Sequence, residues 1–263
     1  MTAEIHIHQV AELQRQLDAA RAELQQFTYA VSHDLRAPLR HINAYAQIIE
    51  EDWPDMPAEM AGHLGTIRQS AQLLSSQLAG LTELARLNLQ PLNLQPVNVG
   101  ALAQEVADEL AAQHPQQGVE WQLSADVPPV LADAALLRQL LAHLLGNALK
   151  FSRGRQPAQI ALRWRLATPA VAEPGLAEPG EPAAPAAAMC QITISDNGVG
   201  FAPEQAKALF KVFGKLHPAR EFEGLGLGLV TCRKLVERLG GSIAIEGAAE
   251  AGCSVTVTLP LAN

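Results

Sequence analysis

The chain has 263 residues, of which 48% are hydrophobic and 17% charged, and its formal net charge is −8 at pH 7. This length suits one large or two small domains, and the composition is that of an ordinary folded, soluble protein. The negative charge, with no run rich in Lys or Arg, argues against a nucleic-acid-binding surface.

Membrane and secretion signals are not found in the sequence. No apolar stretch approaches the roughly 18 residues that would cross a bilayer. The start, Met1–Glu4, lacks the basic and apolar regions of a signal peptide. Cys190, Cys232 and Cys253 are odd in number and have no metal-type spacing. We therefore expect a cytoplasmic chain without a membrane span, whose cysteines are reduced and inert.

The first third of the chain has the apolar pattern of a long helix. Apolar residues recur at alternating steps of three and four, at Val10, Leu13, Leu17, Ala20, Leu24, Phe27 and Val31. This heptad repeat is typical of a seam between paired helices. One amphipathic helix on a core is the alternative, but three heptads with Gln, Arg and Glu between them favour a dimer seam.

A second helix is predicted at about 59–87. Its apolar residues are Leu64, Ile67, Ala71, Leu74, Leu78, Leu81 and Leu84. The intervening segment 52–57 contains two prolines and is predicted to turn. Two helices joined in this way form a hairpin, and two hairpins in a homodimer form a four-helix bundle.

Pro91 and Pro96 mark the boundary to a second domain, in which strands and helices alternate. Period-two alternation predicts a strand at 159–166 and a partner at 189–195, and further strands are predicted at 242–246 and 254–259. The segment 167–188 is rich in Pro, Ala, Gly and Glu, and we expect it to be a disordered, solvated loop that carries no chemistry.

The segment Ser32–Leu39 contains a histidine suited to accept a phosphoryl group. His33 lies two residues after the seam position Val31 and is predicted to point outward. Neutral imidazole is a nucleophile near pH 7, because its unperturbed pKa is about 6.5. Pro38 removes the N–H that would bond the carbonyl of Asp34, so the helix should bend or loosen beside His33. For the histidine alone, an ordinary surface position on a helix that contains Pro is the favoured interpretation.

A helix around Asn147 has one apolar and one polar face. The leucines Leu136, Leu137, Leu140, Leu141, Leu144 and Leu145 share the first face. His143, Asn147 and Lys150 share the second. Such a stripe is usually a solvated surface, but Asn supplies a hard oxygen for Mg²⁺, and Lys a point charge for phosphate.

Two glycine-rich segments follow. Asp196-Asn197-Gly198-Val199-Gly200 comes directly after a predicted strand. Gly224-Leu225-Gly226-Leu227-Gly228 opens a helix predicted to run to Leu239. Glycines allow close approach of backbone to a flat ligand, and N–H groups at a helix start favour anions. The spacing matches neither the phosphate-binding GxxxxGK[ST] loop nor the GxGxxG dinucleotide fingerprint.

Taken in order, these segments resemble the H, N, G1, F and G2 boxes of sensor histidine kinases, especially those with a phytochrome-type output module. The H-box is the Ser32–Leu39 octet, the N-box is Leu140–Phe151, and the F-box is Leu209–Phe213. The resemblance implies an α+β fold, with a helical-hairpin dimerisation domain followed by an α/β sandwich of the Bergerat/GHKL type that binds ATP. The expected boundaries are a signalling coiled coil at 1–26, the phosphoacceptor hairpin at 27–90 and the ATP-binding domain at 96–263.

The resemblance also implies the roles of individual residues. His33 would take the γ-phosphoryl group of ATP while Asp34 accepts a proton from the other ring nitrogen. Asn147 would ligate Mg²⁺, Lys150 would touch phosphate and Asp196 would read the adenine amino group. The implied nucleotide-binding residues are His143, Asn147, Lys150, Asp196, Gly198, Gly200, Gly224, Gly226, Leu227 and Gly228. Gly224 to Gly228 would form the hinge of a lid over ATP, anchored by Phe210 and Phe213.

The expected activity is that of an ATP-dependent protein-histidine kinase. It would phosphorylate His33 and pass the group to an Asp on the receiver domain of a response regulator, under the control of an upstream sensor. One alternative is a weakly catalytic dimeric scaffold that docks a regulator, and another is an ATPase of the related gyrase and chaperone group. His143 and Leu225 depart from the usual N- and G2-boxes. Ala37 stands where many members that also dephosphorylate their partner carry Thr or Asn.

Overall fold

The computed structural model describes residues 2–87, 90–167, 188–218 and 221–262, with only some of the side chains in the first helix. The chain divides into two compact units, Met1–Gln90 and Pro91–Asn263. For the loop expected at 167–188, residues 168–187 lie outside the described part of the chain.

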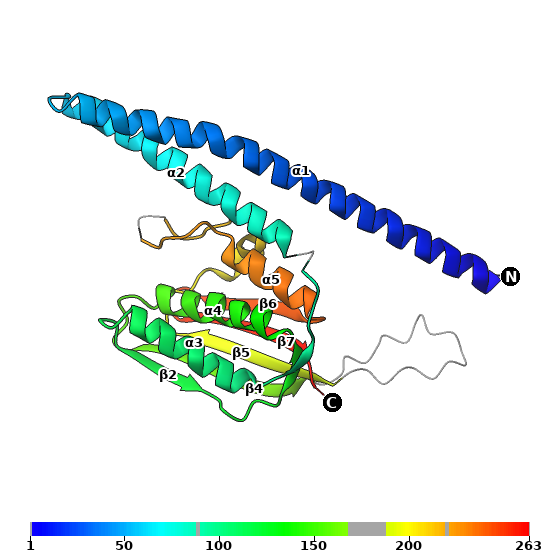
Figure 1. Cartoon of the computed structure of the whole chain (residues 1–263). Helices are drawn as coiled ribbons and strands as arrows, with labels where there is room; N and C mark the ends of the chain where they lie inside the picture. The colour runs from blue at the N-terminus through cyan, green and yellow to red at the C-terminus, as the bar shows by residue number, and fades with distance from the viewer. Residues whose placement is uncertain (1, 88–89, 168–187, 219–220, 263) are drawn as a thin grey trace. The chain divides into compact units, whose positions relative to one another are not determined.

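The first unit is a hairpin of two helices, α1 (Thr2–Asp52) and α2 (Ala58–Arg86) (Figure 1). Between them, the amide of Trp53 donates to the carbonyl of Ile49 at 3.1 Å and that of Met56 to Trp53 at 3.2 Å. These bonds end α1 and turn the chain, and Pro57 then precedes α2 directly. The turn lies where the two prolines of 52–57 predict it.

Helix α1 continues through Pro38. The loosening expected beside His33 therefore does not break the helix. Ser32, Leu39 and Ala46 are buried at steps of seven residues, and Ala71 and Thr82 are buried on α2. This packing holds the turns on both sides of Pro38 in place, because burial of an apolar stripe supplies most of a helix's stability in a protein.

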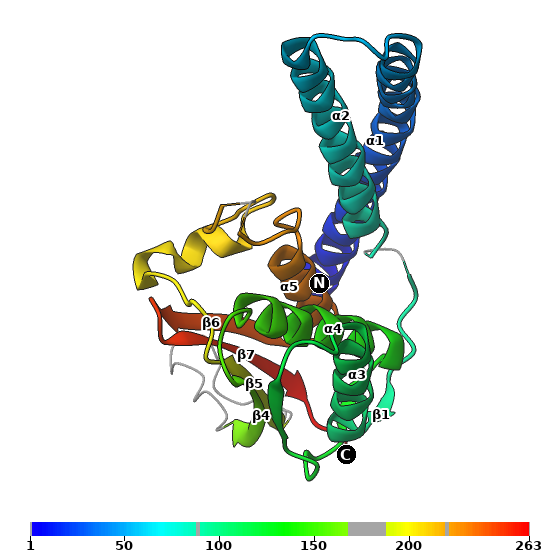
Figure 2. The ribbon, with the colours of Figure 1, turned by 90° about the vertical axis from the view of Figure 1, so that its left-hand side faces the viewer.

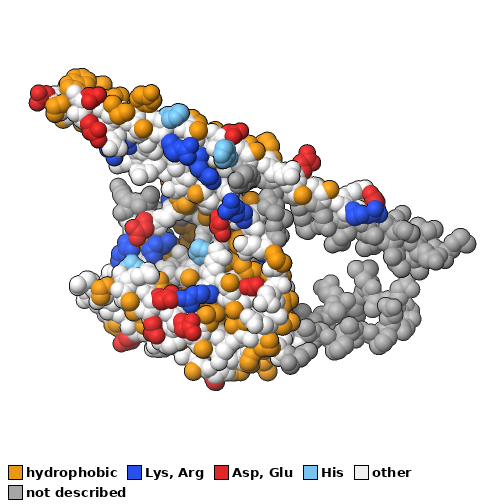
Figure 3. Space-filling view, in the orientation of Figure 1, with side chains coloured by type: hydrophobic (Ala, Val, Ile, Leu, Met, Phe, Trp, Pro, Cys, Tyr) orange, Lys and Arg blue, Asp and Glu red, His pale blue; other side chains and the backbone are white. Residues whose placement is uncertain are grey.

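Other apolar side chains of the hairpin are exposed within the single chain, as Figure 3 shows for the face in view. They include Leu35, Ile42 and Ile49 on α1 and Ile67 and Leu74 on α2. Of the predicted seam, Leu13, Ala20, Phe27 and Val31 are exposed, and the side chains of Val10, Leu17 and Leu24 are outside those described. Contiguous exposed apolar surface of this kind marks a site of association.

The second unit begins with a short strand pair and continues as a sheet covered by helices. Its elements in chain order are β1 (Gln95–Val97), α3 (Val99–Gln113), β2 (Val119–Leu123), β3 (Val130–Ala132), α4 (Ala134–Phe151), β4 (Ala158–Ala167), β5 (Met189–Asp196), η1 (Pro203–Phe210), α5 (Gly228–Arg238), β6 (Ser242–Ala248) and β7 (Gly252–Pro260). Strand β1 pairs antiparallel with β3.

The main sheet has five strands in the order β2-β4-β5-β7-β6. Strands β2 and β4 are parallel, and the other neighbours are antiparallel. Helices α3, α4 and α5 cover one face of this sheet (Figure 2). The alternation of each strand follows from this one-sided cover: Ile160, Leu162, Val257 and Leu259 are buried, while Gln159, Arg163 and Arg165 are exposed.

Helix α4 provides much of the core between helices and sheet. Its buried leucines are Leu136, Leu137, Leu140, Leu141, Leu144, Leu145 and Leu149. Each fully buried leucine stabilises the fold by about 1.5–3 kcal/mol relative to an exposed one. The apolar face predicted from the sequence is therefore the face on the core, and the opposite face carries the polar stripe.

A single carboxylate fixes the start of α4. Asp133 accepts hydrogen bonds from the amides of Ala135 at 3.0 Å and Leu136 at 3.2 Å, and from the amide of Asn93 at 3.0 Å. The bond from Asn93, supported by the other two amides, lowers the pKa of Asp133 below its usual value. Asp133 therefore caps the helix and ties down the segment that leads into the unit. The fold is α+β, a helical hairpin followed by an α/β sandwich, as the sequence predicts.

Candidate functional site

His33 and Asp34 lie on the outer surface of α1. Their side chains are 67% and 82% exposed, and His33 Nδ1 is 3.2 Å from Asp34 Oδ1. The neighbouring Ser32 is buried against the hairpin, so the helix turns His33 away from the core, as predicted. An imidazole whose Nδ1–H donates to a carboxylate carries its lone pair on Nε2, which makes Nε2 the nucleophilic atom.

The polar stripe of α4 lies beside the second glycine-rich segment. Lys150 Nζ donates to the carbonyl of Glu223 at 3.3 Å and lies 4.4 Å from the centroid of the Phe151 ring. Asn147 Nδ2 would be 3.5 Å from a Cβ atom at Gly228, the first residue of α5. The structure thus brings Asn147 and Lys150 together with the segment from Gly224 to Gly228.

Burial lowers the pKa of two groups on this stripe. It lowers the pKa of His143, which favours the neutral imidazole at pH 7. It also lowers the pKa of Lys150, against the opposing effect of the Glu223 carboxylate. A partly desolvated lysine binds an anion more strongly than a hydrated one, because less water is removed on binding.

Asp196 ends β5 and begins the first glycine-rich segment, which we call the glycine loop (196–200). Its Oδ1 accepts a hydrogen bond from the amide of Gly198 at 2.8 Å. Burial raises the pKa of Asp196 to about 6, although amide hydrogen bonds from Gly198 and Cys253 oppose the shift. A desolvated carboxylate at the end of a strand is suited to accept a hydrogen bond from a bound ligand.

The glycine loop passes close to the end of α4. The amide of Val199 donates to the carbonyl of Phe151 at 3.1 Å. A Cβ at Gly198 would lie 2.5 Å from that same carbonyl oxygen, which leaves no room for a side chain. Asn197 attaches the glycine loop to β4, since its Oδ1 accepts a hydrogen bond from the amide of Gln159 at 2.9 Å. The predicted residues of the two segments therefore meet around the last turn of α4.

The second glycine segment requires glycine for conformational reasons. Gly224 and Gly226 have φ angles of 134° and 73°, which side-chain-bearing residues rarely adopt. A Cβ at Gly226 would lie 2.7 Å from the backbone of Phe213, so the segment packs directly on the F-box. Leu227 is buried and caps α5.

The F-box is attached to α5. Arg233 donates to the carbonyl of Phe210 at 3.2 Å, and its guanidinium lies 5.3 Å from the Phe210 ring centroid. Phe213 has a φ of 62°, and the turn that it forms carries the contact with Gly226. Both phenylalanines thus lie beside the segments that would form a lid.

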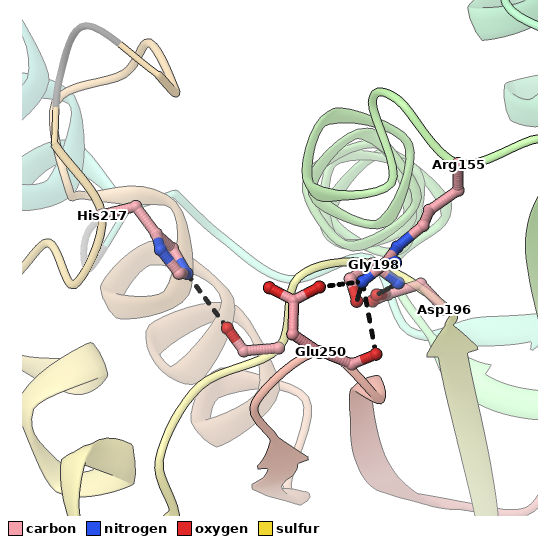
Figure 4. A network of polar contacts seen from close by, with 6 residues as sticks. Arg155, Asp196, Gly198, His217 and Glu250 are labelled. Atoms are coloured by element: carbon pink, nitrogen blue, oxygen red, sulfur yellow. Dashed lines mark hydrogen bonds and ion pairs between the residues drawn. The ribbon is translucent and has the colours of Figure 1, made fainter.

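Sequence reasoning missed an aromatic group and a charged network. The rings of Phe151 and Phe222 are 5.0 Å apart, and His217 lies 5.7 Å and 5.3 Å from them. His217 Nε2 is 3.0 Å from the carbonyl oxygen of Gly200. Arg155 and Glu250 contact the same glycine loop from the other side (Figure 4). No spacing rule links these residues, because the fold brings them from separate segments.

Among the described residues, no group of three His, Cys, Asp or Glu side chains is arranged to hold a metal ion. In the same part of the chain, no helix combines the length and apolar character needed to span a membrane.

Comparison with known proteins assigns this architecture to a family. Residues 132–263 match the model of the histidine kinase-, DNA gyrase B- and HSP90-like ATPases. Residues 23–90 match that of the His kinase A phospho-acceptor domain. The chain belongs to the histidine kinase-, gyrase B- and HSP90-like ATPase family. Within it, the added phospho-acceptor domain makes the chain a sensor histidine kinase core, as its boxes predict.

Curated relatives agree with this assignment. The methanogenesis regulatory histidine kinase FilI of Methanothrix harundinacea (strain 6Ac) is 27% identical over 93% of this chain and 25% of its own length. The phytochrome-like protein Cph1 of Synechocystis sp. is 25% identical over 97% of this chain and 31% of its own. The chain thus spans about a quarter to a third of the length of these relatives.

A solved structure has the same arrangement of elements. Full-length ShkA in complex with AMPPNP is 25% identical and has a TM-score of 0.58, over 90% of this chain and 46% of its own. The histidine kinase AdeS of Acinetobacter baumannii, at 20% identity and a TM-score of 0.54, has the same fold.

Proposed function

We propose that this chain transfers the γ-phosphoryl group of ATP to His33 and then to an aspartate on the receiver domain of a response regulator. The observation that carries the proposal is the chemistry of the two units. One presents an exposed histidine in contact with a carboxylate, and the other joins Asn147, Lys150 and two glycine segments around one helix end.

In the first step, Nε2 of His33 attacks the γ-phosphorus, an N–P bond forms, and the bond to the β,γ-bridging oxygen breaks, which releases ADP. The ring thereby becomes cationic, and the proton on Nδ1 passes toward Asp34 Oδ1, which lies 3.2 Å away. The carboxylate acts as general base and favours the tautomer that is nucleophilic at Nε2. In the second step, a carboxylate oxygen of the regulator's aspartate forms an O–P bond while the N–P bond to His33 breaks, and the proton returns from Asp34 to Nδ1, so that the imidazole leaves neutral.

The nucleotide is proposed to bind where the two glycine segments meet α4. Ionised Asp196 accepts a hydrogen bond from the adenine amino group, and Gly198 and Gly200 let the loop that lies beside the purine pack closely on Phe151 and Ala248. Lys150 contacts phosphate, together with the half-buried neutral His143 and the segment Gly224, Gly226, Leu227 and Gly228. In the present structure Lys150 Nζ instead contacts the Glu223 carbonyl, so binding would exchange that bond for one to phosphate.

The residues present fit a Mg²⁺ ion bound mainly by nucleotide. Mg²⁺ prefers oxygen ligands and usually keeps several waters, with one or two protein ligands and substrate phosphates. The side-chain oxygen of Asn147, a residue of α4, would be such a ligand. When bound, the ion neutralises charge on the phosphates.

The exposed apolar stripe of the hairpin supports a homodimer in which two hairpins form a four-helix bundle. Leu35, Ile42 and Ile49 recur at seven-residue steps and would face the partner's helices. We further propose that the chain acts in the cytoplasm, with its stimulus received by a sensor region or sensor protein joined to α1.

Labelling with γ-³²P ATP tests the proposal. The parent chain should acquire label that is acid-labile and alkali-stable, as expected for a phosphoramidate, and His33→Ala should acquire none. His41→Ala is the matched control, because His41 is also an exposed histidine on α1, and it should label normally. Retained label in His33→Ala would refute the assignment. ATP binding without any label on His33 would indicate a nucleotide-binding scaffold instead.

A further inference from the structure

The turn between β6 and β7 lies directly against the glycine loop. A Cβ at Gly200 would be 1.9 Å from the carbonyl oxygen of Ala248, and a Cβ at Gly252 would be 1.9 Å from that of Asp196. The amide of Glu250, a residue with φ of 60°, donates to the carbonyl of Val199 at 2.7 Å. The two backbones therefore touch, and the turn forms one wall behind the loop.

Arg155, in the connection between α4 and β4, joins these two backbones. Its Nη2 atom lies 3.2 Å from the carbonyl oxygen of Gly198 and 3.2 Å from that of Glu250. The same nitrogen is 2.7 Å from Glu250 Oε2 (Figure 4). One charged group thus contacts the glycine loop and the turn together, and hydrogen bonds from a charged donor are stronger than neutral ones.

These contacts determine how the peptides around Gly198 are oriented. The Gly198 carbonyl accepts from Arg155, while the Gly198 amide donates to Asp196 Oδ1 at 2.8 Å. A rotation of the 198–199 peptide away from Arg155 would also disturb the bond from Val199 to Phe151. The amide that contacts the Asp196 carboxylate is in the preceding 197–198 peptide, which shares the Cα of Gly198 with the 198–199 peptide that Arg155 holds.

We propose that Arg155, braced by Glu250, is a positioning residue that holds the glycine loop in the conformation that binds the purine part of the nucleotide. The inference rests on the proposed function, since it takes the loop as the adenine-binding element. Arg155 acts through the backbone of Gly198 and Val199. Its loss should weaken binding of the purine and ribose, with no separate effect on phosphate contacts or on the chemistry at His33.

The test compares Arg155→Ala with Arg138→Ala in the full chain. The two arginine side chains are similarly exposed, at 33% and 36%, and Arg138 pairs with Glu105 and Glu109 away from the glycine loop. We expect Arg155→Ala to weaken binding of ATP and of adenosine by the same factor, roughly three- to tenfold, by calorimetric titration. The KM for ATP should rise with kcat unchanged. Arg138→Ala should bind both ligands as the parent does.

Glu250→Ala tests the brace. The loss of adenosine affinity in Glu250→Ala should be smaller than the loss in Arg155→Ala. The double variant should bind adenosine no more weakly than Arg155→Ala alone, because Glu250 acts through the arginine. The proposal would be overturned if the losses of affinity in the two single variants added fully in the double variant. It would also be overturned if Arg155→Ala left the affinity for adenosine unchanged or weakened the binding of ATP alone.

Hydrogen exchange keeps the two proposals separable. The amide of Val199 should exchange faster in Arg155→Ala than in the parent or in Arg138→Ala, whether or not nucleotide binds. If the parent bound no ATP, the proposed function would fail, while exchange would still report on the positioning role. Should Arg155→Ala fail to fold, Glu250→Ala carries the same exchange test, with unchanged Val199 exchange counting against the proposal.

Discussion

The two units differ in where their apolar side chains go. Among the described residues, 13 large apolar side chains are exposed in the helical unit and 4 in the second unit, although the second unit is the longer. The second unit buries its leucines and valines between helices and sheet. Among the hairpin side chains that the structure describes, the buried apolar ones are Leu39, Ala46, Ala71 and Leu87. One unit therefore contains its own core, and the other exposes apolar surface that the proposed dimer would bury.

The largest expected effect concerns this incomplete core. Ile42 is 44% exposed in the single chain, and Ile42→Asp would place two carboxylates in the proposed bundle. Each unpaired buried polar group costs about 1–3 kcal/mol. The dimer dissociation constant should therefore rise at least about thirtyfold, as measured by sedimentation equilibrium.

The control for that experiment is Leu166→Asp in the second unit, where the side chain is already 61% exposed. It should leave the dissociation constant as in the parent. A dimer that tolerates Ile42→Asp would show that the exposed stripe of α1 serves another partner, and the contrast between the units would lose its explanation.

A smaller effect tests whether the proposed nucleotide site lies within the second unit alone. The pKa of Asp196 is raised by burial to about 6. Below that pH the carboxyl becomes protonated and is a weaker acceptor for an adenine amino group. Adenosine affinity should therefore decrease by up to about tenfold per pH unit below pH 6 and level off above it.

Adenosine is chosen because it has no phosphate that titrates in this range. Asp196→Asn should bind adenosine weakly at every pH, with no dependence of the affinity on pH. Asp133→Asn should keep the pH dependence of the parent. A parent affinity that is constant from pH 5 to 7.5 would contradict the assignment of Asp196.

The smallest effect concerns the stability of the self-contained unit. Asp133→Ala removes an acceptor for three amides and should destabilise the second unit by about 1–2 kcal/mol in urea unfolding. Asn98→Ala removes the hydrogen-bond acceptor of a single amide of α3, and it should destabilise the unit less than Asp133→Ala does. Tryptophan fluorescence in a Trp53→Phe background restricts the signal to this unit, where Trp121 and Trp164 lie.

The pH dependence of this effect has a defined sign. The folded pKa of Asp133 is lowered, so its contribution is present above the unfolded value of about 3.9 and is lost as the pH falls through the lowered value. The stabilities of parent and variant should therefore converge in strong acid.

The unfolding midpoint of the second unit should also be independent of protein concentration. A concentration-dependent midpoint would mean that this unit too is completed by association.

Much of this architecture could be predicted because the signals are local. The heptads predict α1, the leucine face predicts α4, and period-two alternation predicts β4 and β5. Helix α3 and strands β1 to β3 were missed, since a three-residue strand such as Val130–Ala132 offers too few residues for a period to be detected. The parallel pairing of β2 with β4 is likewise set by the sheet as a whole.

The candidate site was only partly predictable for the same reason. Asn147, Lys150 and the glycines stand in short motifs. Arg155, His217 and Glu250 stand in none, and they reach the glycine loop only after the chain has folded. His217 is 17 residues from its acceptor Gly200, and Arg155 is 95 residues from Glu250. Contacts across such separations have no periodicity in the sequence.

The direction of β5 places the connection from β4 and the glycine loop at opposite ends of the strand. At its start, Met189 pairs with Ala167, and at its end, Asp196 pairs with Ile160. The eight residues of β5 span about 25 Å. The chain between β4 and β5 therefore joins these strands at the end opposite the glycine loop. An affinity tag or fluorophore inserted there would be attached far from the proposed nucleotide site, which makes this connection a suitable point for immobilising or labelling the protein.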